Sequence, residues 1–542
     1  MFKRVLSVFL MLAVLFGLCA CGSDNEDVLI MPIDSDPLCL DPQIADSKSA
    51  KLIIENCYEG LVRLDSEKKI IPGVAESWSV SSDGLTYTFK LRTDSHWKLL
   101  NSFKGVLPED YKESYRTRVI ASDFVFALRR ALSPITQAAD AEKLFCIRNA
   151  VEINSGKKSV SELGVTAKDD QTLVISLSRA NPDFLRILTL PVAMPCHEAF
   201  FNATHAKYGL DLKYTFCNGP FYLSRWAEDN VLSAYKNDEY KGNFKVKPTE
   251  IYFYVNEDEG SVVQKIRQRT YDCAFISDSA HTKLSDNDKI TEYSVNNTVN
   301  GLCFNCSDTV LSNENLRRAL VMATDTNELL STVPDAFTDG IIPENVRYGE
   351  SSYREAAGKI GTTAYNEAQA LALWKKGLKE LGVEAAKVVI SCTEKDAPKM
   401  QELIQNWQYV FSVSILAKVE IKTDEQIRTM IYNTNYQAIF YKLTADSSCV
   451  TDMLKKFTST SSANIFAFSD KDYDSTVNAI INACSGADII AKCRNAEKMI
   501  LDKAVFLPMS CSPTYAVTNK DVDGLCFSST LDSVCFINGG HS

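Results

Sequence analysis

The strongest constraint on this chain lies at its N-terminus. Lys3 and Arg4 precede an apolar run of 14 residues, from Val5 to Leu18, which ends in small residues. A membrane span needs about 20 apolar residues, so this run is short for a span and typical of a secretory signal peptide. We therefore expect residues 1–20 to be a signal peptide and the remainder to fold outside the cytoplasm.

The end of this segment, Leu18-Cys-Ala-Cys21, resembles a bacterial lipoprotein signal. By that resemblance Cys21 carries a diacylglyceryl group and becomes the first residue after cleavage behind Ala20, and residues 21–27 form a polar tether. Two or more acyl chains hold a protein firmly, since each buried CH₂ contributes about 0.8 kcal/mol. The expected location is the extracytoplasmic face of a bacterial cell membrane. An ordinary signal peptide with an incidental cysteine is the alternative.

Length and charge limit the number of domains and the kinds of partner that the remaining chain can have. Of the 542 residues, the 522 from Cys21 onward are too many for one hydrophobic core and predict two or three domains. The formal net charge is −11, and no basic stripe is present to bind phosphates, which argues against a nucleic-acid partner. No later apolar run reaches the length of a membrane span.

Cysteine is frequent, with 17 residues in the chain. Without Cys19 and Cys21 an odd number remains, so at least one thiol has no partner within the chain. The scattered spacing favours buried free thiols over a disulfide framework. Cys303 and Cys306 are the only close pair, and zinc would require two further ligands.

The pattern of apolar residues predicts a mixed α/β protein. In the first part we expect strands at 28–33, 172–177, 221–226 and 231–235, a hairpin at 80–92, and helices at 48–61 and from Ala121, capped by Ser122 or Asp123. In the second part we expect strands at 387–391 and 414–421, and helices at 316–330, 366–381 and 397–408. Alternation of strand and helix indicates a parallel-leaning sheet.

No catalytic motif is present. The sequence lacks Gly-x-Ser-x-Gly, His-Glu-x-x-His and a glycine-rich phosphate loop, and its five histidines are far apart. We therefore predict no catalytic residues, no metal ligands and no cofactor.

Several short motifs occur in a fixed order from about residue 28 to the C-terminus. They are Asn56-Cys-Tyr-Glu-Gly-Leu-Val62, Pro72-Gly-Val-Ala-Glu-Ser-Trp78, Asp123-Phe-Val-Phe-Ala-Leu-Arg-Arg130, Leu163-Gly-Val-Thr-Ala-Lys-Asp-Asp170, Asn218-Gly-Pro-Phe-Tyr222 and Asn315-Leu-Arg-Arg-Ala-Leu320. Together they resemble family 5 of the bacterial extracellular solute-binding proteins, the substrate-binding lipoproteins of oligopeptide and dipeptide ABC transporters. The likeness is greatest to oligopeptide-binding proteins.

The resemblance implies an α/β fold of the type II periplasmic-binding-protein kind, with two lobes, a hinge and an extra third domain. The expected division is 28–58, 181–305 and 506–542 for lobe I, 59–180 for accessory domain II, and 306–505 for lobe III. Closure of the lobes would bury the ligand between them.

Two acidic residues match ligand contacts of the family. Asp446 aligns with the aspartate that meets the peptide N-terminus, and Asp46 falls at the position of an acid lining the cleft. A carboxylate in a closed cleft would pair with the ligand ammonium group, and the peptide backbone would supply the other hydrogen bonds. The alternatives are a solvated loop acid for Asp446 and a cap of the helix from Lys48 for Asp46.

Other motif residues are expected to be scaffold, namely Tyr58, Glu59, Trp78, Trp97, Asp123, Arg129 and Trp226. The segment 443–449 keeps only Ala445 and Asp446 of the family pattern, and Phe440 replaces a basic residue that is common in oligopeptide binders. The ligand preference of the family therefore cannot be transferred.

The function expected from this resemblance is capture of oligopeptides by a monomeric, lipid-anchored binding protein for an ABC permease and ATPase complex. One alternative is the same fold binding a nickel chelate, haem or an oligosaccharide. A peptide or pheromone sensor is another. A hydrolase is the least favoured, because no nucleophile and base can be paired.

Overall fold

The computed structural model describes residues 27–103, 106, 116–181, 183–255, 258–331, 340–348, 351–361, 364–445, 449–482, 487–528 and 533–542. The predicted signal peptide, Cys21 and Asp446 lie outside these residues. Within the described ranges, no helix is both long enough and apolar enough to cross a membrane.

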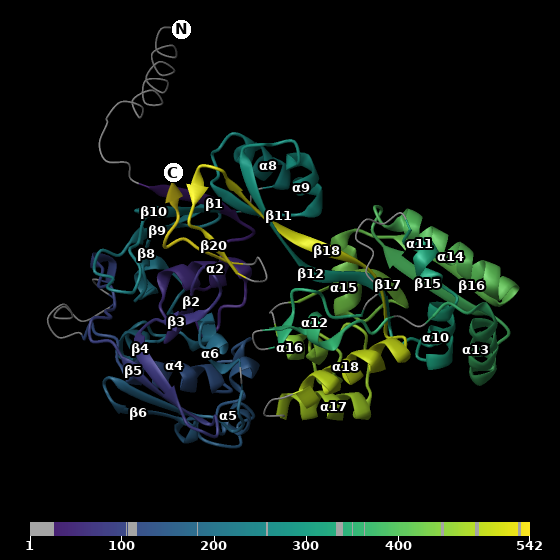
Figure 1. Ribbon diagram of the computed structural model, residues 1–542, viewed down its shortest axis with the longest axis horizontal. Coiled ribbons are helices and arrows are strands. Elements are labelled where there is room, and N and C mark those ends of the chain that lie inside the picture. Colours follow the sequence, from purple (N-terminus) through teal and green to yellow (C-terminus); the bar gives the residue numbers. More distant parts are fainter. Residues whose placement is uncertain are drawn as a thin grey trace, which may run out of the picture.

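The protein has two α/β halves, which Figure 1 places side by side. The first half contains two four-stranded sheets. In spatial order their strands are β1 (Val28–Ile33), β10 (Glu250–Val255), β9 (Val231–Lys236) and β8 (Phe221–Ala227), and β4 (Ala75–Val80), β5 (Thr86–Leu91), β7 (Thr172–Ser176) and β6 (Val165–Asp169).

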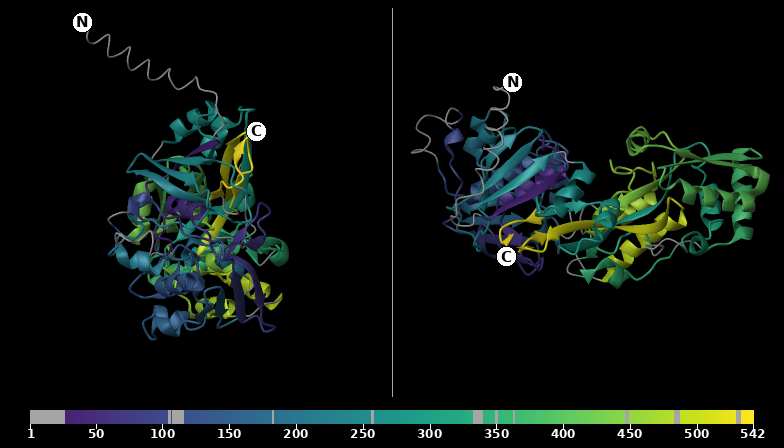
Figure 2. Two further views of the ribbon diagram at one scale, coloured as in Figure 1. Left: turned by 90° about the vertical axis from the view of Figure 1, so that its left-hand side faces the viewer. Right: turned by 90° about the horizontal axis from the view of Figure 1, so that it is seen from above.

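A six-stranded sheet connects the halves. Its spatial order is β11 (Cys273–Ile276), β18 (Phe506–Asn519), β12 (Ile290–Phe304), β17 (Ala438–Thr444), β15 (Ala386–Cys392) and β16 (Ile415–Ile421). The long strands β12 and β18 pair antiparallel, with register shifts beside Asn296 and Asn300. Seen from above in Figure 2, this pair runs from one half into the other. The predicted lobe boundaries at 305 and 506 fall at strand ends and stay predictions.

Helices cover both faces of this sheet in the second half. Alternate residues of β12 enter two cores, so that Leu302 and Phe304 pack on one face and Val299 and Cys303 on the other. The helices of the second half are α10 (Glu314–Met322), α11 (Thr326–Leu329), α12 (Tyr353–Ala357), α13 (Glu367–Leu381), α14 (Ala397–Phe411), α15 (Asp424–Tyr432), α16 (Val450–Lys455), α17 (Lys471–Asn482) and α18 (Ala487–Asp502).

The first half has its own core and shorter helices. These helices are α2 (Lys48–Cys57), α4 (Ala121–Leu132), α5 (Ala150–Asn154), α6 (Phe184–Ile187), α7 (Glu198–Ala203), α8 (Glu259–Arg267) and α9 (Asp278–Leu284). Two-stranded hairpins complete the fold: β2 (Val62–Leu64) with β3 (Ile70–Pro72), β13 (Arg347–Tyr348) with β14 (Ser351–Ser352), β19 (Val522–Asp523) with β22 (Gly540–His541), and β20 (Cys526–Phe527) with β21 (Val534–Cys535).

The predicted cap of α4 is wrong. Ile120 occupies the N-cap position, and Asp123 reaches back to accept a hydrogen bond from its backbone nitrogen at 3.0 Å. The same buried carboxylate binds Arg116 at 2.6 Å and the indole nitrogen of Trp97 at 3.1 Å. Asp123 and Trp97 are thus scaffold residues, as the sequence predicts.

The predicted helix 316–330 is also wrong, because it is two helices. The first, α10, ends at Met322, and Asp325 starts α11 by accepting hydrogen bonds from the backbone nitrogens of Asn327 and Glu328. A side chain that caps a new helix competes with continuation of the preceding one.

Candidate functional site

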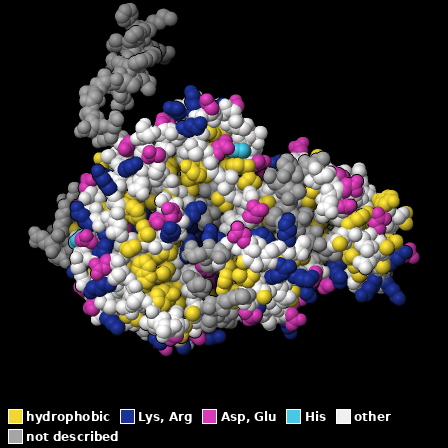
Figure 3. All heavy atoms as spheres, viewed as in Figure 1, with side chains coloured by type: hydrophobic (Ala, Val, Ile, Leu, Met, Phe, Trp, Pro, Cys, Tyr) yellow, Lys and Arg dark blue, Asp and Glu magenta, His cyan; other side chains and the backbone are white. Residues whose placement is uncertain are grey.

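A cavity of about 610 Å³ lies between the two halves. The first half contributes residues from 46–68, 140–146 and 179–194, and the second contributes residues from 347–348, 444–455 and 480–489. Asn297 of β12 and residues of the hairpin formed by β20 and β21 also line it. Figure 3 shows Lys and Arg side chains on both sides of the seam between the halves. The strands β12 and β18 connect the two halves that bound this cavity. Bending of these strands would move the halves apart and open the cavity.

The two halves touch at this cavity. The Sγ atom of Cys449, in the second half, lies 4.0 Å from the Oδ2 atom of Asp183, in the first. A β-bridge joins Cys449 to Arg347, so the hairpin of β13 and β14 is held at the same wall. The structure is therefore one in which both halves enclose the cavity.

Asp46 lines the cavity with an exposed side chain. The alternative reading of Asp46 as a helix cap is wrong, because Ser47 caps α2 by accepting a hydrogen bond from the backbone nitrogen of Ala50 at 3.2 Å. The Asp46 carboxylate is thus placed where a ligand could reach it. Its role in binding stays a prediction.

Asp446 lies outside the described residues, but its neighbours line the cavity. Thr444 and Ala445 are part of the wall, as is Cys449. The backbone nitrogen of Ala445 donates to the carbonyl oxygen of Asn297 at 2.8 Å, which ties this wall to β12. Contact between Asp446 and a ligand also stays a prediction.

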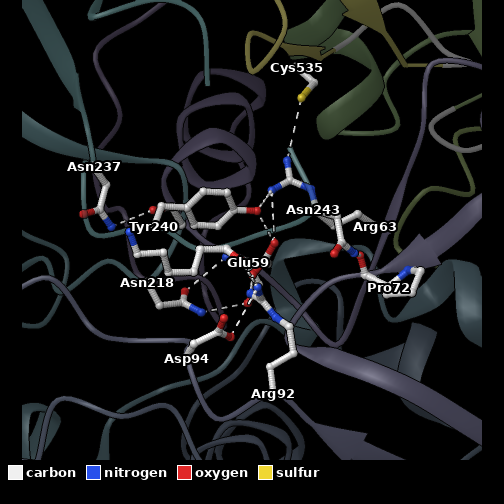
Figure 4. A network of polar contacts seen from close by, with 12 residues as sticks. Glu59, Arg63, Pro72, Arg92, Asp94, Asn218, Asn237, Tyr240, Asn243 and Cys535 are labelled. Atoms are coloured by element: carbon white, nitrogen blue, oxygen red, sulfur yellow. Dashed lines mark hydrogen bonds and ion pairs between the residues drawn. The ribbon is translucent and has the colours of Figure 1, made fainter. Parts of the chain in front are cut away.

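A buried ion-pair network supports the wall of the first half (Figure 4). The Glu59 side chain is 1% exposed and accepts hydrogen bonds from Arg92 at 2.8 Å and from the hydroxyl of Tyr240. Arg63, which lines the cavity, lies 3.6 Å from the same carboxylate. Burial and the Glu59 charge raise the pKa of Tyr240. Glu59 thus has a structural role, as predicted, and it holds the guanidinium group of Arg63 at the cavity wall.

A second buried carboxylate supports the opposite wall. Glu497 on α18 is fully buried and accepts hydrogen bonds from the backbone nitrogens of Ile341 and Ile342 at 2.8 and 3.1 Å. Tyr353 and Arg354 donate to it at 3.0 and 2.7 Å. The segment fixed in this way leads directly into β13, whose two residues line the cavity.

Four cysteines belong to the described lining of the cavity, namely Cys146, Cys449, Cys526 and Cys535. Burial raises the pKa of Cys526 to about 11 and that of Cys449 to about 12, so both are protonated at neutral pH. A protonated thiol is a poor nucleophile. Among the described residues no histidine lines the cavity, and no cluster of three or more His, Cys, Asp and Glu could hold a metal ion. Cys303 is buried, and Cys306 contacts the carbonyl of Phe304 at 3.8 Å.

Sequence reasoning assigned none of the nine described Lys and Arg residues of the cavity wall to the site, and three of them show why. Lys68 follows β2 in a turn, Arg186 belongs to the short helix α6, and Arg347 belongs to the two-residue strand β13. None belongs to a motif with fixed spacing, and only the folded chain brings them to one cavity wall. No local pattern could have identified them.

Comparison with known proteins gives consistent matches over most of the chain. Residues 69–464 match the model of the bacterial extracellular solute-binding proteins, family 5 Middle. The dipeptide-binding protein DppE of Bacillus subtilis is 26% identical, over 93% of this chain and 90% of that protein. The dipeptide-binding protein of Lactococcus lactis subsp. cremoris is also 26% identical, over 95% of this chain and 94% of that protein.

The fold has close structural counterparts. The crystal structure of the substrate-binding domain of an oligopeptide ABC transporter from Bacillus anthracis superimposes with a TM-score of 0.74 and 25% identity. The match covers 96% of this chain and 99% of that one. The α/β fold of the type II periplasmic-binding-protein kind, predicted from sequence, is confirmed.

Proposed function

Because the chain belongs to family 5 of the bacterial extracellular solute-binding proteins, we propose that it captures peptides between its two halves and delivers them to an ABC permease and ATPase complex. The observation that carries this proposal is the cavity of about 610 Å³ bounded by both halves. Relatives that match over nine-tenths of the chain are dipeptide-binding proteins, which favours a peptide as ligand.

Binding would use the groups that all peptides share. An extended ligand can pair its backbone with strand edges and loops of the cavity, and its ammonium group can pair with a carboxylate. We assign that carboxylate to Asp446, whose neighbours line the wall, with Asp46 as a second acid on the other half. Closure excludes water and strengthens these pairs.

The protein would act without catalysing a reaction. The cavity thiols Cys449 and Cys526 are protonated at neutral pH, and no histidine among the described lining residues could serve as their base. The same absence of histidine disfavours a nickel chelate or haem as the solute. A sensor that binds the same peptides differs only in its partner.

Native mass spectrometry of the purified chain tests the ligand class. We expect co-purified masses that form a series of peptides of mixed sequence. One defined non-peptide mass, or no shift with a peptide library, would contradict peptide binding.

As a matched test of the carboxylates, Asp446→Asn should weaken binding of peptides with a free N-terminus more than of acetylated ones. Equal weakening would show that Asp446 does not pair with the ammonium group.

Anchoring is tested separately at Cys21. We propose that Cys21 is lipidated, on the basis of the preceding Leu18-Cys-Ala segment. Cys21→Ser should move the protein from the membrane fraction to the soluble fraction, because a protein without its acyl chains has no anchor. Cys19→Ser is the matched control and should remain with the membrane. Retention of the Cys21→Ser variant in the membrane fraction would disprove lipid anchoring at this position.

A further inference from the structure

Two of the cysteines that line the cavity face each other across a hairpin. Cys526 belongs to β20 and Cys535 to β21, and the two residues are directly opposite in the antiparallel register. Nine positions separate them in the sequence, so no local spacing marks them as a pair. Because successive side chains of a strand point to opposite faces, residues that are directly opposite project from the same face of the hairpin. The two thiols are therefore neighbours.

The backbone spacing of this pair suits a disulfide bond. The backbone nitrogen of Ser528 donates to the carbonyl oxygen of Ser533 at 2.8 Å, which makes these two residues a hydrogen-bonded pair of the ladder. Hydrogen-bonded and non-hydrogen-bonded pairs alternate along an antiparallel ladder, so Cys526 and Cys535, two positions further along, are again a hydrogen-bonded pair. The Cα atoms of such a pair are about 5.5 Å apart. The commonest Cα separation in disulfides is about 5.5–6 Å, so the bond can close without movement of the strands.

The hairpin is fixed to the rest of the first half. The Nδ2 atom of Asn56, on α2, donates to the carbonyl oxygen of Val534 at 2.9 Å. The Oδ1 atom of Asn56 accepts a hydrogen bond from the backbone nitrogen of Phe536 at 3.0 Å. Phe527 and Val534, one from each strand, are buried in the core of the first half. Both strands are thus held in place, and the two sulfur atoms stay within reach of each other.

Each thiol also contacts the segment that contains β2. The Nη2 atom of Arg63 donates to the Sγ atom of Cys535 at 3.7 Å (Figure 4). The thiol of Cys526 donates to the carbonyl oxygen of Asp65 at 3.6 Å. Burial raises the pKa of Cys526 to about 11, and the neighbouring Cys535 thiol adds to this rise. Both cysteines are nevertheless only partly buried and line the cavity, from which a small thiol reagent can reach them.

We propose that Cys526 and Cys535 are a redox-active pair, which low-molecular-weight disulfides convert into a disulfide bond across the hairpin. In the first step the thiolate of one cysteine attacks a sulfur atom of the reagent RS–SR, forms a mixed disulfide and releases one RS⁻. The second cysteine then loses its proton to solvent and attacks the protein sulfur of the mixed disulfide, which releases the second RS⁻. The two RS⁻ take up the two protons that the cysteines lost. Two protein thiols are thus oxidised by two electrons, and one reagent disulfide is reduced to two thiols.

The modification acts on a wall of the cavity. Oxidation removes the proton that Cys526 donates to the carbonyl oxygen of Asp65, and the new bond cross-links the two strands of the hairpin. Proteins of this family are extracellular, and disulfides persist outside the cytoplasm. The inference does not depend on which ligand the cavity binds.

Peptide mapping by mass spectrometry tests the pair. Trypsin cleaves after Lys520, and residues 521–542 contain no Lys or Arg and no cysteine besides Cys526 and Cys535. The purified chain is incubated with oxidised glutathione, alkylated with iodoacetamide and digested. We expect a peptide 521–542 that is lighter by two hydrogen atoms and carries no alkyl group, and that carries two alkyl groups when dithiothreitol precedes alkylation. A wild-type peptide that takes up both alkyl groups without dithiothreitol, or that keeps a bound glutathione, would overturn the inference.

Single variants and a denatured reference sharpen this test. Cys526→Ser and Cys535→Ser should each stop at the mixed disulfide, so that the remaining cysteine keeps one glutathione. Cys449→Ser is the matched control, because it removes another cysteine of the cavity lining and should leave closure of the hairpin disulfide unchanged.

The same reaction in concentrated urea measures closure without the fold. We expect the equilibrium constant for closure by glutathione to be about tenfold or more larger in the native chain, because the ladder holds the two sulfur atoms together. Equal constants would show that the fold does not position the pair and would overturn the inference. A chain that closes this disulfide but binds no peptide would support the pair and contradict the proposed function alone.

Discussion

Glu497→Ala is expected to lower the free energy of unfolding of the second half by about 3–5 kcal/mol, the usual cost of breaking a buried ion pair. The truncation leaves the Arg354 guanidinium without its carboxylate partner at 2.7 Å. It also removes the acceptor for the backbone nitrogens of Ile341 and Ile342 and for the hydroxyl of Tyr353.

Urea unfolding followed by tryptophan fluorescence would measure this loss. Trp374 and Trp407 are fully buried in the second half and report on it. Asp502→Ala is the matched control, because Asp502 lies on the same helix and pairs with Lys498 at 2.7 Å in solvent. Exposed pairs contribute about 0–1 kcal/mol. Equal midpoints for Glu497→Ala and Asp502→Ala would show that the buried network contributes no more than a surface pair.

The same substitution should weaken ligand binding. The backbone groups that Glu497 holds lead into β13, and β13 supplies Arg347 and Tyr348 to the cavity. Glu497→Gln keeps the shape and one acceptor oxygen, so we expect it to retain more stability and more binding than the alanine variant.

Glu59→Ala should have an effect of similar size on the first half, again about 3–5 kcal/mol. Arg92 loses its partner at 2.8 Å, and Tyr240 loses the acceptor of its hydroxyl. Arg63 loses the carboxylate that fixes it at the cavity wall. We therefore expect lower stability and weaker binding together.

Glu76→Ala is a suitable control for this experiment, because Glu76 is an exposed acid on β4. It removes the same charge from the same half without breaking a buried pair. Thermal unfolding of the two variants would be compared with that of Glu59→Gln, which preserves the shape of the side chain. A Glu59→Ala variant as stable as Glu76→Ala would contradict a stabilising role for the network.

Local sequence patterns predicted those elements that are defined by local chemistry. The helix expected at 366–381 runs from Glu367 to Leu381, begins after the capping side chain of Asn366 and ends at Gly382, whose φ is +70°. The strand expected at 28–33 is β1. Caps and alternating burial are properties of a few neighbouring residues, so a single sequence reveals them.

The rest depends on contacts between distant segments. Asp123 is a residue type that often caps helices, but its carboxylate also binds Arg116 and Trp97, and no local pattern indicates these two contacts. Asp46 was predicted to line a cleft through a family resemblance, and the structure places it at the cavity. Lys68, Arg186 and Arg347 belong to no motif, because they come from separate short segments that only the folded chain brings to one cavity.

The pairing of β12 with β18 has a consequence for how the chain folds. Residues 290–304 find their partners at residues 506–519, so the central ladder cannot form until nearly the whole chain is available. Closing so large a loop carries an entropic cost, and pairings between distant segments slow folding. We expect the first half to acquire protection from hydrogen exchange early during refolding, and the β12–β18 amides to acquire it last.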